Sequence, residues 1–297
     1  MSATTARAGG ETTPQLDREV TRASDGLLDL EFTRGPDGCS RLRTCRQRFP
    51  LRTTMPFHLD SGAPDMAFVY VQNPTGGVFA GDHLLTKLTA GPGARVHLTS
   101  QSATKLYRME GGEASQELRF ELGAHAYIES IPDALIPQAG ARYRQRTVVQ
   151  LDAGAAFVGV ETIAPGRRAH GERFAYELVE IGTRVVFQAG ELCAERLRLE
   201  PQRAAPARPG VLGHADYLIS LFAVAPDRDA SLLAAAIDSA LAAESGFRGA
   251  AGELPHGAGA MARMLAESAV LAERARRCAW GAARQALLGL RLPETRK

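Results

Sequence analysis

The chain has 297 residues, of which 45% are hydrophobic and 23% are charged, and its formal net charge is +2. This length suits one large all-β domain or two ordinary domains, and the composition is that of a globular protein. The near balance of charge gives no general attraction to nucleic acid or to membrane surfaces, and no segment has the roughly 20 consecutive apolar residues of a membrane span. We therefore expect a cytoplasmic protein whose partners include neither nucleic acid nor membrane.

The amino-terminal segment is rich in Ala, Thr and Gly and lacks the apolar stretch of a signal peptide. We predict a disordered tail over residues 1–20 and a single β-rich domain over residues 21–297. None of the four cysteines forms a C-x-x-C pair, which argues against a zinc framework or a dense set of disulfides. Reduced thiols agree with a cytoplasmic location.

Short strands separated by Gly, Pro and Asp turns are predicted from about Gly26 to Leu199. Alternation with period two is clear in Leu28–Phe32, Arg95–Thr99 and Arg173–Leu178. No amphipathic helix separates these strands, which disfavours a βαβ parallel sheet. Further strands are predicted at Met66–Val71, Leu84–Thr89, Glu117–Leu122, Ala126–Ile131, Arg146–Leu151, Ala155–Thr162, Arg184–Gln188, Leu192–Leu199 and Tyr217–Val224.

A glycine-rich turn lies between two of these strands, at Asn73–Asp82. Gly76 and Gly81 have the spacing of a phosphate-binding loop, but Asp82 and His83 stand where that motif needs Lys and then Ser or Thr. A carboxylate there would repel phosphate. The pattern instead favours a tight β-turn that presents the Asp82 carboxylate.

The composition shifts to helix formers after Pro226. Ser231 is a candidate N-cap for a helix over about residues 231–243, Gly252–Gly259 has the composition of a loop, and a second helix is predicted over about residues 265–288. The expected fold is mainly β. It consists of stacked, largely antiparallel sheets in one elongated domain, with two α-helices from the carboxyl-terminal half packed on it.

Motifs of familiar catalytic sites are absent from the sequence. There is no G-x-S-x-G nucleophile elbow and no H-E-x-x-H zinc motif, and the seven histidines are scattered singly. A tightly preformed metal site is therefore not predicted.

Several acids stand beside turn residues, where turn chemistry or an arginine salt bridge explains each one alone. As a set they suit another role, because carboxylates bind first-row metals less tenaciously than thiolates or imidazoles do. An acid-lined path would therefore pass a metal ion without trapping it. The candidate carboxylates for such a metal passage are Asp82, Glu129, Asp133, Glu161 and Glu172.

Four sequence blocks and a carboxyl-terminal pair together resemble a known family. They are G-G-V-F-A-G-D at Gly76–Asp82, T-S-Q-S-A-T-K-L-Y-R at Thr99–Arg108, E-S-I-P-D-A-L-I-P at Glu129–Pro137, G-R-R-A-H-G-E-R-F at Gly166–Phe174, and Trp280 with Arg284. In this order and spacing they are similar to the signature of the urease accessory protein UreD (UreH) family. Ser100 and Ala134 depart from the residues common in that family.

The resemblance implies a non-enzymatic maturation factor with a β-rich fold and two helices. It implies partners in urease apoprotein and in the accessory proteins UreF and UreG, with GTP bound by UreG and not by this chain. No tightly bound cofactor is implied, only nickel in transit through a water-filled passage. The residues that would line this passage or brace it are Thr99, Gln101, Thr104, Lys105, Arg108 and Arg167.

Two alternatives remain open at this stage. The first is a β-sandwich hydrolase that uses a carboxylate pair, with Glu129 and Glu161 as the candidates. The second is a purely structural adaptor whose acids never meet metal.

Overall fold

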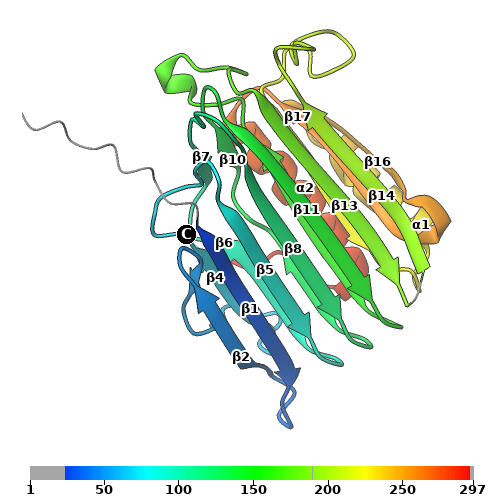
Figure 1. The fold of residues 1–297 in the computed structure, drawn as a ribbon. Coiled ribbons are helices and arrows are strands. Elements are labelled where there is room, and N and C mark those ends of the chain that lie inside the picture. The colour runs from blue at the N-terminus through cyan, green and yellow to red at the C-terminus, as the bar shows by residue number, and fades with distance from the viewer. Residues whose placement is uncertain (1–23, 189, 295–297) are drawn as a thin grey trace, which may run out of the picture.

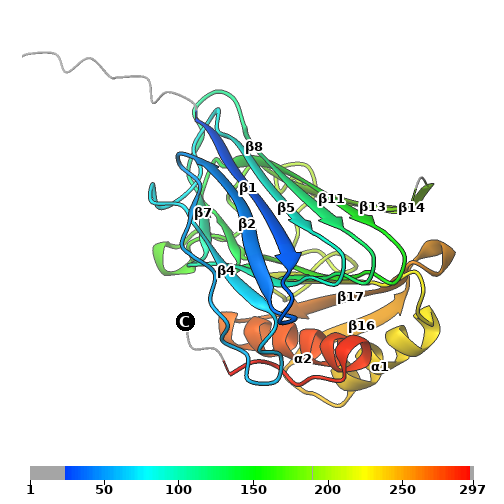
Figure 2. The same cartoon turned by 90° about the horizontal axis from the view of Figure 1, so that it is seen from below.

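The computed structural model describes residues 24–188 and 190–294. Two β-sheets stack face to face, and two α-helices cover the outer face of one sheet (Figures 1 and 2). The mainly β fold and the two helices in the carboxyl-terminal half are thus confirmed. The tail predicted over residues 1–20 lies outside the described residues.

The first sheet has seven strands. In spatial order they are β14 (Gly190–Leu199), β13 (Leu178–Phe187), β11 (Arg142–Leu151), β8 (Ala114–Leu122), β5 (His83–Ala90), β1 (Asp25–Arg34) and β2 (Ser40–Arg48).

The second sheet packs below the first and carries the helices on its other face. Its main path runs through β16 (Phe247–Glu253), β17 (Gly259–Ala266), β15 (Tyr217–Val224), β12 (Ala156–Ile163), β9 (Tyr127–Ser130), β6 (Arg95–Ser100), β4 (Ala67–Gln72) and β3 (Arg52–Thr53), with β10 (Leu135–Pro137) and β7 (Thr104–Leu106) attached beside β12. Two short 3-10 helices occur at Arg168–His170 and Pro255–Gly257.

The prediction of largely antiparallel sheets is wrong. Nine of the fifteen strand pairings in the described chain are parallel. Parallel neighbours need a long crossover connection, which is usually a helix. Here a strand of the opposite sheet makes the crossover, as β6 does between β5 and β8. The absence of intervening helices therefore did not exclude parallel pairing.

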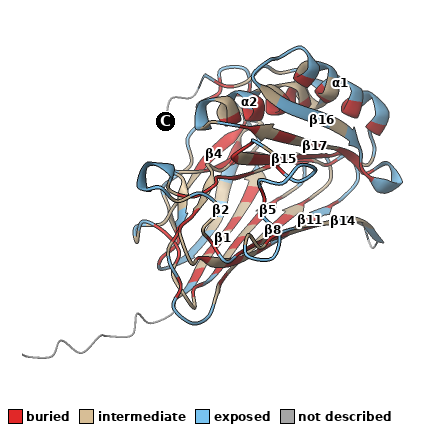
Figure 3. Ribbon diagram, turned by 90° about the horizontal axis from the view of Figure 1, so that it is seen from above, coloured by how far each residue is buried: buried red, intermediate tan, exposed pale blue. Residues whose placement is uncertain are grey.

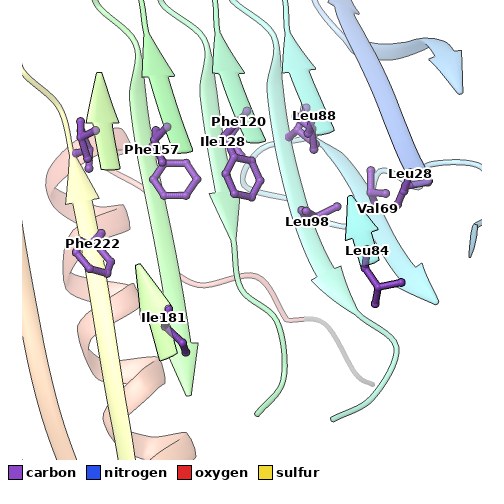
Figure 4. Packing of buried hydrophobic residues seen from close by; sticks show 14 of the residues in the cluster. Leu28, Val69, Leu84, Leu88, Leu98, Phe120, Ile128, Phe157, Ile181 and Phe222 are labelled. Carbon is purple, nitrogen blue, oxygen red and sulfur yellow. The ribbon is translucent and has the colours of Figure 1, made fainter. Parts of the chain in front are cut away.

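The main core lies between the two sheets (Figure 4). Leu88 and Phe120 of the first sheet meet Ile128, Phe157 and Phe222 of the second, and the rings of Phe120 and Phe157 lie 4.9 Å apart. Burying an aliphatic or aromatic side chain of this size contributes roughly 1.5–3 kcal/mol. Alternate residues of each strand point into this core, which accounts for the period-two pattern of the sequence.

A second core lies between the lower sheet and the helices α1 (Ala230–Ala242) and α2 (Ala269–Leu288), as Figure 3 shows. The predicted helix starts are corrected. Asp229, not Ser231, accepts the hydrogen bond that caps α1, and Ser268 caps α2. Neither helix is long and apolar enough to cross a bilayer.

Two further segments differ from the sequence prediction. Residues 173–177 form no strand, because β13 begins at Leu178. The second helix does not begin near residue 265, because residues up to Ala266 belong to β17. The loop predicted at Gly252–Gly259 is found as the connection between β16 and β17 and contains the 3-10 helix Pro255–Gly257. Met and Ala in Gly259–Ala266 favour a helix, but pairing with β15 and β16 on both sides overrides that local preference.

Candidate functional site

A cavity of about 110 Å³ lies between the two sheets, lined by apolar side chains of the core together with a group of polar residues. A water molecule needs about 10–15 Å³ measured in this way, so the cavity has room for several. The polar residues that line it are Thr86, Thr99, Ser100, Thr104, Gln116, Ser130, Asp133, Gln145, Thr147, Glu161, Thr162 and Thr183.

A row of threonines from the first sheet lines one wall of this cavity. Thr86, Thr147 and Thr183 stand in one register line of the first sheet, interrupted only by Leu118. Within the described residues, the buried hydroxyls of Thr86, Thr183 and Thr162 form no hydrogen bond with another protein group. Thr86 and Thr183 face the cavity, whereas Thr162 lies on the other face of β12, with Val158 and Val160 of the core under the helices. Because a buried hydroxyl without a partner is unfavourable by roughly 1–3 kcal/mol, we infer that water in the cavity satisfies Thr86 and Thr183.

Glu161 projects into this cavity from β12 in the lower sheet. Gln145 Nε2 donates a hydrogen bond to Glu161 Oε1 over 2.9 Å, and Thr147 Oγ1 lies 3.4 Å from the same oxygen. Both donors come from the upper sheet, so the carboxyl group bridges the two layers. Burial raises the pKa of Glu161 to about 7, with a further contribution from the charge of Glu195. The group is therefore divided between its two protonation states near neutral pH.

The pKa of Glu161 predicts a pH-dependent stability. The folded chain holds the Glu161 proton between the ordinary pKa of 4.5 and about 7, so stability falls as pH rises through this window. Glu161→Gln removes that loss. We expect it to raise the free energy of unfolding by about 2–3 kcal/mol above pH 7 and to have little effect below pH 4.5. Urea unfolding at several pH values measures this, and a difference that is constant with pH would contradict it.

An ion pair between the two sheets lies to one side of the cavity. Glu161, Ser220 and Arg263 stand in one register line of the lower sheet, and Arg263 donates to Glu195 of β14 in the upper sheet over 2.8 Å. The Arg263 side chain is one-third exposed, so this pair lies near the outer edges of both sheets.

At the other side, the cavity adjoins a smaller hollow formed by two of the sequence blocks quoted above, Gly76–Asp82 and Thr99–Arg108. Val71, Ser100, Thr104 and Gln116 line both the cavity and this smaller hollow, which Gly76 and Gly77 also border. The blocks are hydrogen-bonded to each other, because Val78 N donates to Lys105 O over 2.8 Å and Tyr107 N donates to Val78 O over 3.0 Å. Phe79 stacks on Tyr107 at 4.6 Å.

Gly77 is the tightest point of this contact. A Cβ atom there would lie 2.5 Å from both Lys105 O and the Tyr107 ring. We therefore expect Gly77→Ala to destabilise the protein by about 1–3 kcal/mol. The matched control is Gly252→Ala, where a Cβ meets nothing within 4 Å. Midpoints of urea unfolding compare the two, and equal midpoints would show that the turn yields to the extra methyl group.

A separate buried polar cluster ties α2 to the lower sheet. Glu129 is fully buried and accepts hydrogen bonds from Tyr127 OH at 2.9 Å, Trp280 Nε1 at 3.1 Å and Arg284. His97 Nδ1 lies 2.8 Å from the same carboxylate. Arg284 also pairs with Asp60. These interactions hold the pKa of Glu129 below its ordinary value although burial opposes them.

Comparison with known proteins agrees with this arrangement of sequence blocks. A family model described as UreD urease accessory protein matches residues 24–297. The chain belongs to the UreD family. It is 34% identical over 263 residues to the Urease accessory protein UreD of Mycolicibacterium gilvum, covering 89% of this chain and 95% of that protein. It is 38% identical over 282 residues to the Urease accessory protein UreD 2 of Streptomyces griseus, covering 93% of this chain and 94% of that protein. It is 40% identical over 219 residues to the Urease accessory protein UreD of Deinococcus radiodurans, covering 72% and 76%.

The UreD resemblance inferred from the sequence is thus confirmed, and the structure explains its blocks. The glycine turn packs on the Thr99–Arg108 block at the cavity opening. Trp280 and Arg284 both bind Glu129 of the third block. The first two blocks thus meet at the cavity opening, and the carboxyl-terminal pair meets the third block under α2. In the fourth block, Arg168 and Arg173 pair with Asp216.

The structure brings only two of the five predicted carboxylates to the cavity, Asp133 and Glu161. Asp82 is buried under the glycine turn, where it accepts hydrogen bonds from Ser24 N, Ser24 Oγ and Phe79 N. It braces the turn and is not presented to solvent. Glu172 pairs with Arg167, which lowers the pKa of Glu172, and also accepts from Ala139 N over 3.2 Å.

Glu129 faces the helices, whereas Glu161 faces the cavity. Tyr127 and Ile131, two residues away on either side of Glu129, belong to the helix-side core, and Phe157 and Ile163 on the Glu161 face belong to the inter-sheet core. The two acids are therefore on opposite faces of one sheet. The carboxylate pair required by the hydrolase alternative is not formed.

The predicted passage-lining residues also divide. Thr99 and Thr104 line the cavity, although Thr99 Oγ1 is held by Ile131 O over 2.7 Å. Gln101 is exposed and borders the smaller opening. Lys105 and Arg108 are exposed, and Arg108 Nε lies 3.7 Å from Glu110. No three His, Cys, Asp or Glu side chains of residues 24–188 and 190–294 group closely enough to hold a metal ion.

The polar residues of the first sheet that line the cavity were not predicted from the sequence. Gln145 and Thr147 occupy inward positions of β11, between the buried residues Tyr143 and Val149. Polar residues at core positions of an alternating strand were the available signal. Their convergence with Thr86 and Thr183 depends on parallel register, which the sequence did not reveal.

Proposed function

We propose that this chain is a non-catalytic subunit of a urease maturation complex, which bridges urease apoprotein to UreF and UreG and conducts nickel to the urease active site through the cavity between its sheets. Nickel is the cargo of this path and not a resident cofactor. GTP binding belongs to UreG, and the chain itself holds no tightly bound cofactor.

The observation that carries this proposal is the polar cavity in a member of the UreD family. Glu161 and Asp133 supply carboxylates to it, and unpartnered threonine hydroxyls supply sites for water. Oxygen ligands of this kind bind a first-row divalent metal weakly enough to release it. Water retained along the wall lets the ion keep part of its hydration shell as it moves.

Two hollows share lining residues with the cavity, which supports a path that leads through it. It shares Thr104 and Ser100 with the opening under the glycine turn. It shares Asp133 and Thr162 with a hollow of about 300 Å³ beside the first turns of α2, where Glu273 and Arg276 lie. Nickel would enter at one of these hollows and leave at another.

Coexpression with the urease subunits and UreF- and UreG-type proteins of the same genome tests the proposal. We expect one complex on size-exclusion chromatography, nickel-loaded active urease only when this chain is present, and no GTP or ATP hydrolysis by this chain alone. Nucleotide hydrolysis by the purified chain, or full urease activation without it, would refute the proposal.

A purely structural adaptor is the second candidate, favoured by the number of predicted acids that other groups of the protein already hold. Asp82, Glu129 and Glu172 all have structural partners. An adaptor predicts that substitutions at Glu161 leave nickel delivery unchanged as long as the complex assembles.

A further inference from the structure

One side of the sandwich is formed by a single segment, residues 41–59, which we call the 41–59 edge. It includes most of β2, the last strand of the upper sheet, and β3, the last strand of the lower sheet (Figure 2). Thr53 N donates to the side-chain oxygen of Gln47 over 3.1 Å, which joins the two parts. The edges of both sheets therefore present one continuous surface.

The 41–59 edge concentrates positive charge. It contains the five arginines 41, 43, 46, 48 and 52 and no Asp or Glu. The other 278 residues contain 30 Lys and Arg against 33 Asp and Glu, so their formal net charge is −3. The small net charge of the whole chain thus hides a basic edge on a slightly acidic body. Arg41 pairs with Asp37 and Arg46 lies 3.9 Å from Asp29, so Arg43, Arg48 and Arg52 carry most of the charge that no carboxylate offsets.

The same edge concentrates exposed apolar side chains. Of the seven large hydrophobic side chains that are exposed in the described residues, four lie within eleven positions: Phe49, Met55, Phe57 and Leu59. Met55 is 74% exposed. Single exposed hydrophobic residues are ordinary on protein surfaces, but several in one segment that also carries five arginines are typical of an interaction site.

We propose that the 41–59 edge is a docking surface for an acidic segment of a partner protein that also carries apolar side chains, a proposal that rests on the role in urease maturation. Arginine guanidinium groups match carboxylates in paired hydrogen bonds, and the apolar side chains supply the area that a charged contact alone lacks. A second copy docked edge to edge would place five arginines against five, which opposes self-association.

The position of the edge links docking to the cavity. Leu51 of this segment lines the opening under the glycine turn, and Val71, which pairs with Thr53, lines both that opening and the cavity. A partner bound to the 41–59 edge therefore lies beside the hollow under the glycine turn, which borders the cavity. This surface is distinct from the two helices, which cover the outer face of the lower sheet.

Two substituted chains test the surface in the coexpressed complex with urease and the other accessory proteins. One carries Met55→Ser with Phe57→Ser, and the other carries Arg43→Glu with Arg46→Glu. The matched control carries Leu232→Ser with Val270→Ser, whose side chains on α1 and α2 are 69% and 71% exposed. We expect each edge variant to weaken complex formation by about tenfold or more and the control to change it by less than about twofold. Hydrogen exchange of the wild-type complex should show protection over the 41–59 edge.

The outcomes separate this proposal from the proposed function. A complex that forms with undiminished affinity for both edge variants, or that leaves the edge unprotected, overturns the docking surface alone. A wild-type chain that binds none of the coexpressed proteins overturns both. Edge-dependent binding to phosphatidylserine vesicles, or an edge-dependent dimer of the chain alone, with the complex unaffected, would assign the surface to a membrane or to a second copy and overturn the proposal.

Discussion

Replacing Arg284 by Met is expected to lower the free energy of unfolding by about 3–5 kcal/mol. The Arg284 side chain is fully buried and pairs with both Asp60 and Glu129, which are themselves buried. Methionine would fill much of the volume but leave two carboxylates without their countercharge. One cation thus holds α2, the loop before β4 and strand β9 together.

Urea unfolding of the purified chain measures this loss. Arg277→Met is the matched control, because Arg277 lies on the exposed face of the same helix, and it should change stability by less than about 0.5 kcal/mol. Adding Asp60→Asn and Glu129→Gln to Arg284→Met should recover part of the loss by removing the unpaired charges. An Arg284→Met chain as stable as the control would show that the buried cluster of Arg284, Asp60 and Glu129 does not stabilise the protein.

Glu161→Gln is expected to slow urease activation by roughly tenfold at about pH 8, because it removes the carboxylate that faces both sheets in the cavity. The amide has nearly the same shape and can still bond to Gln145, so assembly of the complex should persist. Activation is measured as urease activity gained after nickel is added to the purified complex, assayed at one fixed pH.

The pH dependence distinguishes a metal-contacting role from a structural one. A carboxylate binds metal only when it is deprotonated, and the pKa of Glu161 is raised by burial to about 7. The difference between wild type and Glu161→Gln should therefore narrow when activation is run at about pH 6. Glu121→Gln, on the outer face of the upper sheet beside Lys87, should be neutral at both pH values. If Glu161→Gln slows urease activation equally at both pH values, the structural adaptor is favoured.

The sequence predicted local structure better than the arrangement of strands. The strand at Tyr217–Val224 is observed with the same bounds, because eight buried or nearly buried residues in a row leave little choice. The prediction of antiparallel pairing was wrong because strand direction depends on which sheet each strand joins. Strand β6 has the same alternation of buried and exposed residues whether its neighbours are parallel or antiparallel.

The candidate site was predicted only in part, for a related reason. Glu161 and Asp133 were identified as acids near turns, and both line the cavity. Glu129 looks the same in the sequence, but its position in β9 points its side chain to the other face of the sheet, under α2. The partners that neutralise it, Trp280 and Arg284, are about 150 residues away, so only the fold reveals that its ligands are protein groups.

The most direct measurement is the nickel content of urease matured by a chain whose cavity is filled. Thr183→Phe places a ring in the space beside the unpartnered hydroxyls, while Thr183→Val has the shape of threonine and leaves the space open. With complexes of equal composition, Thr183→Phe should load about tenfold less nickel per urease active site than wild type, and Thr183→Val should lie between the two. Full loading through the Thr183→Phe chain would contradict passage of nickel between the sheets.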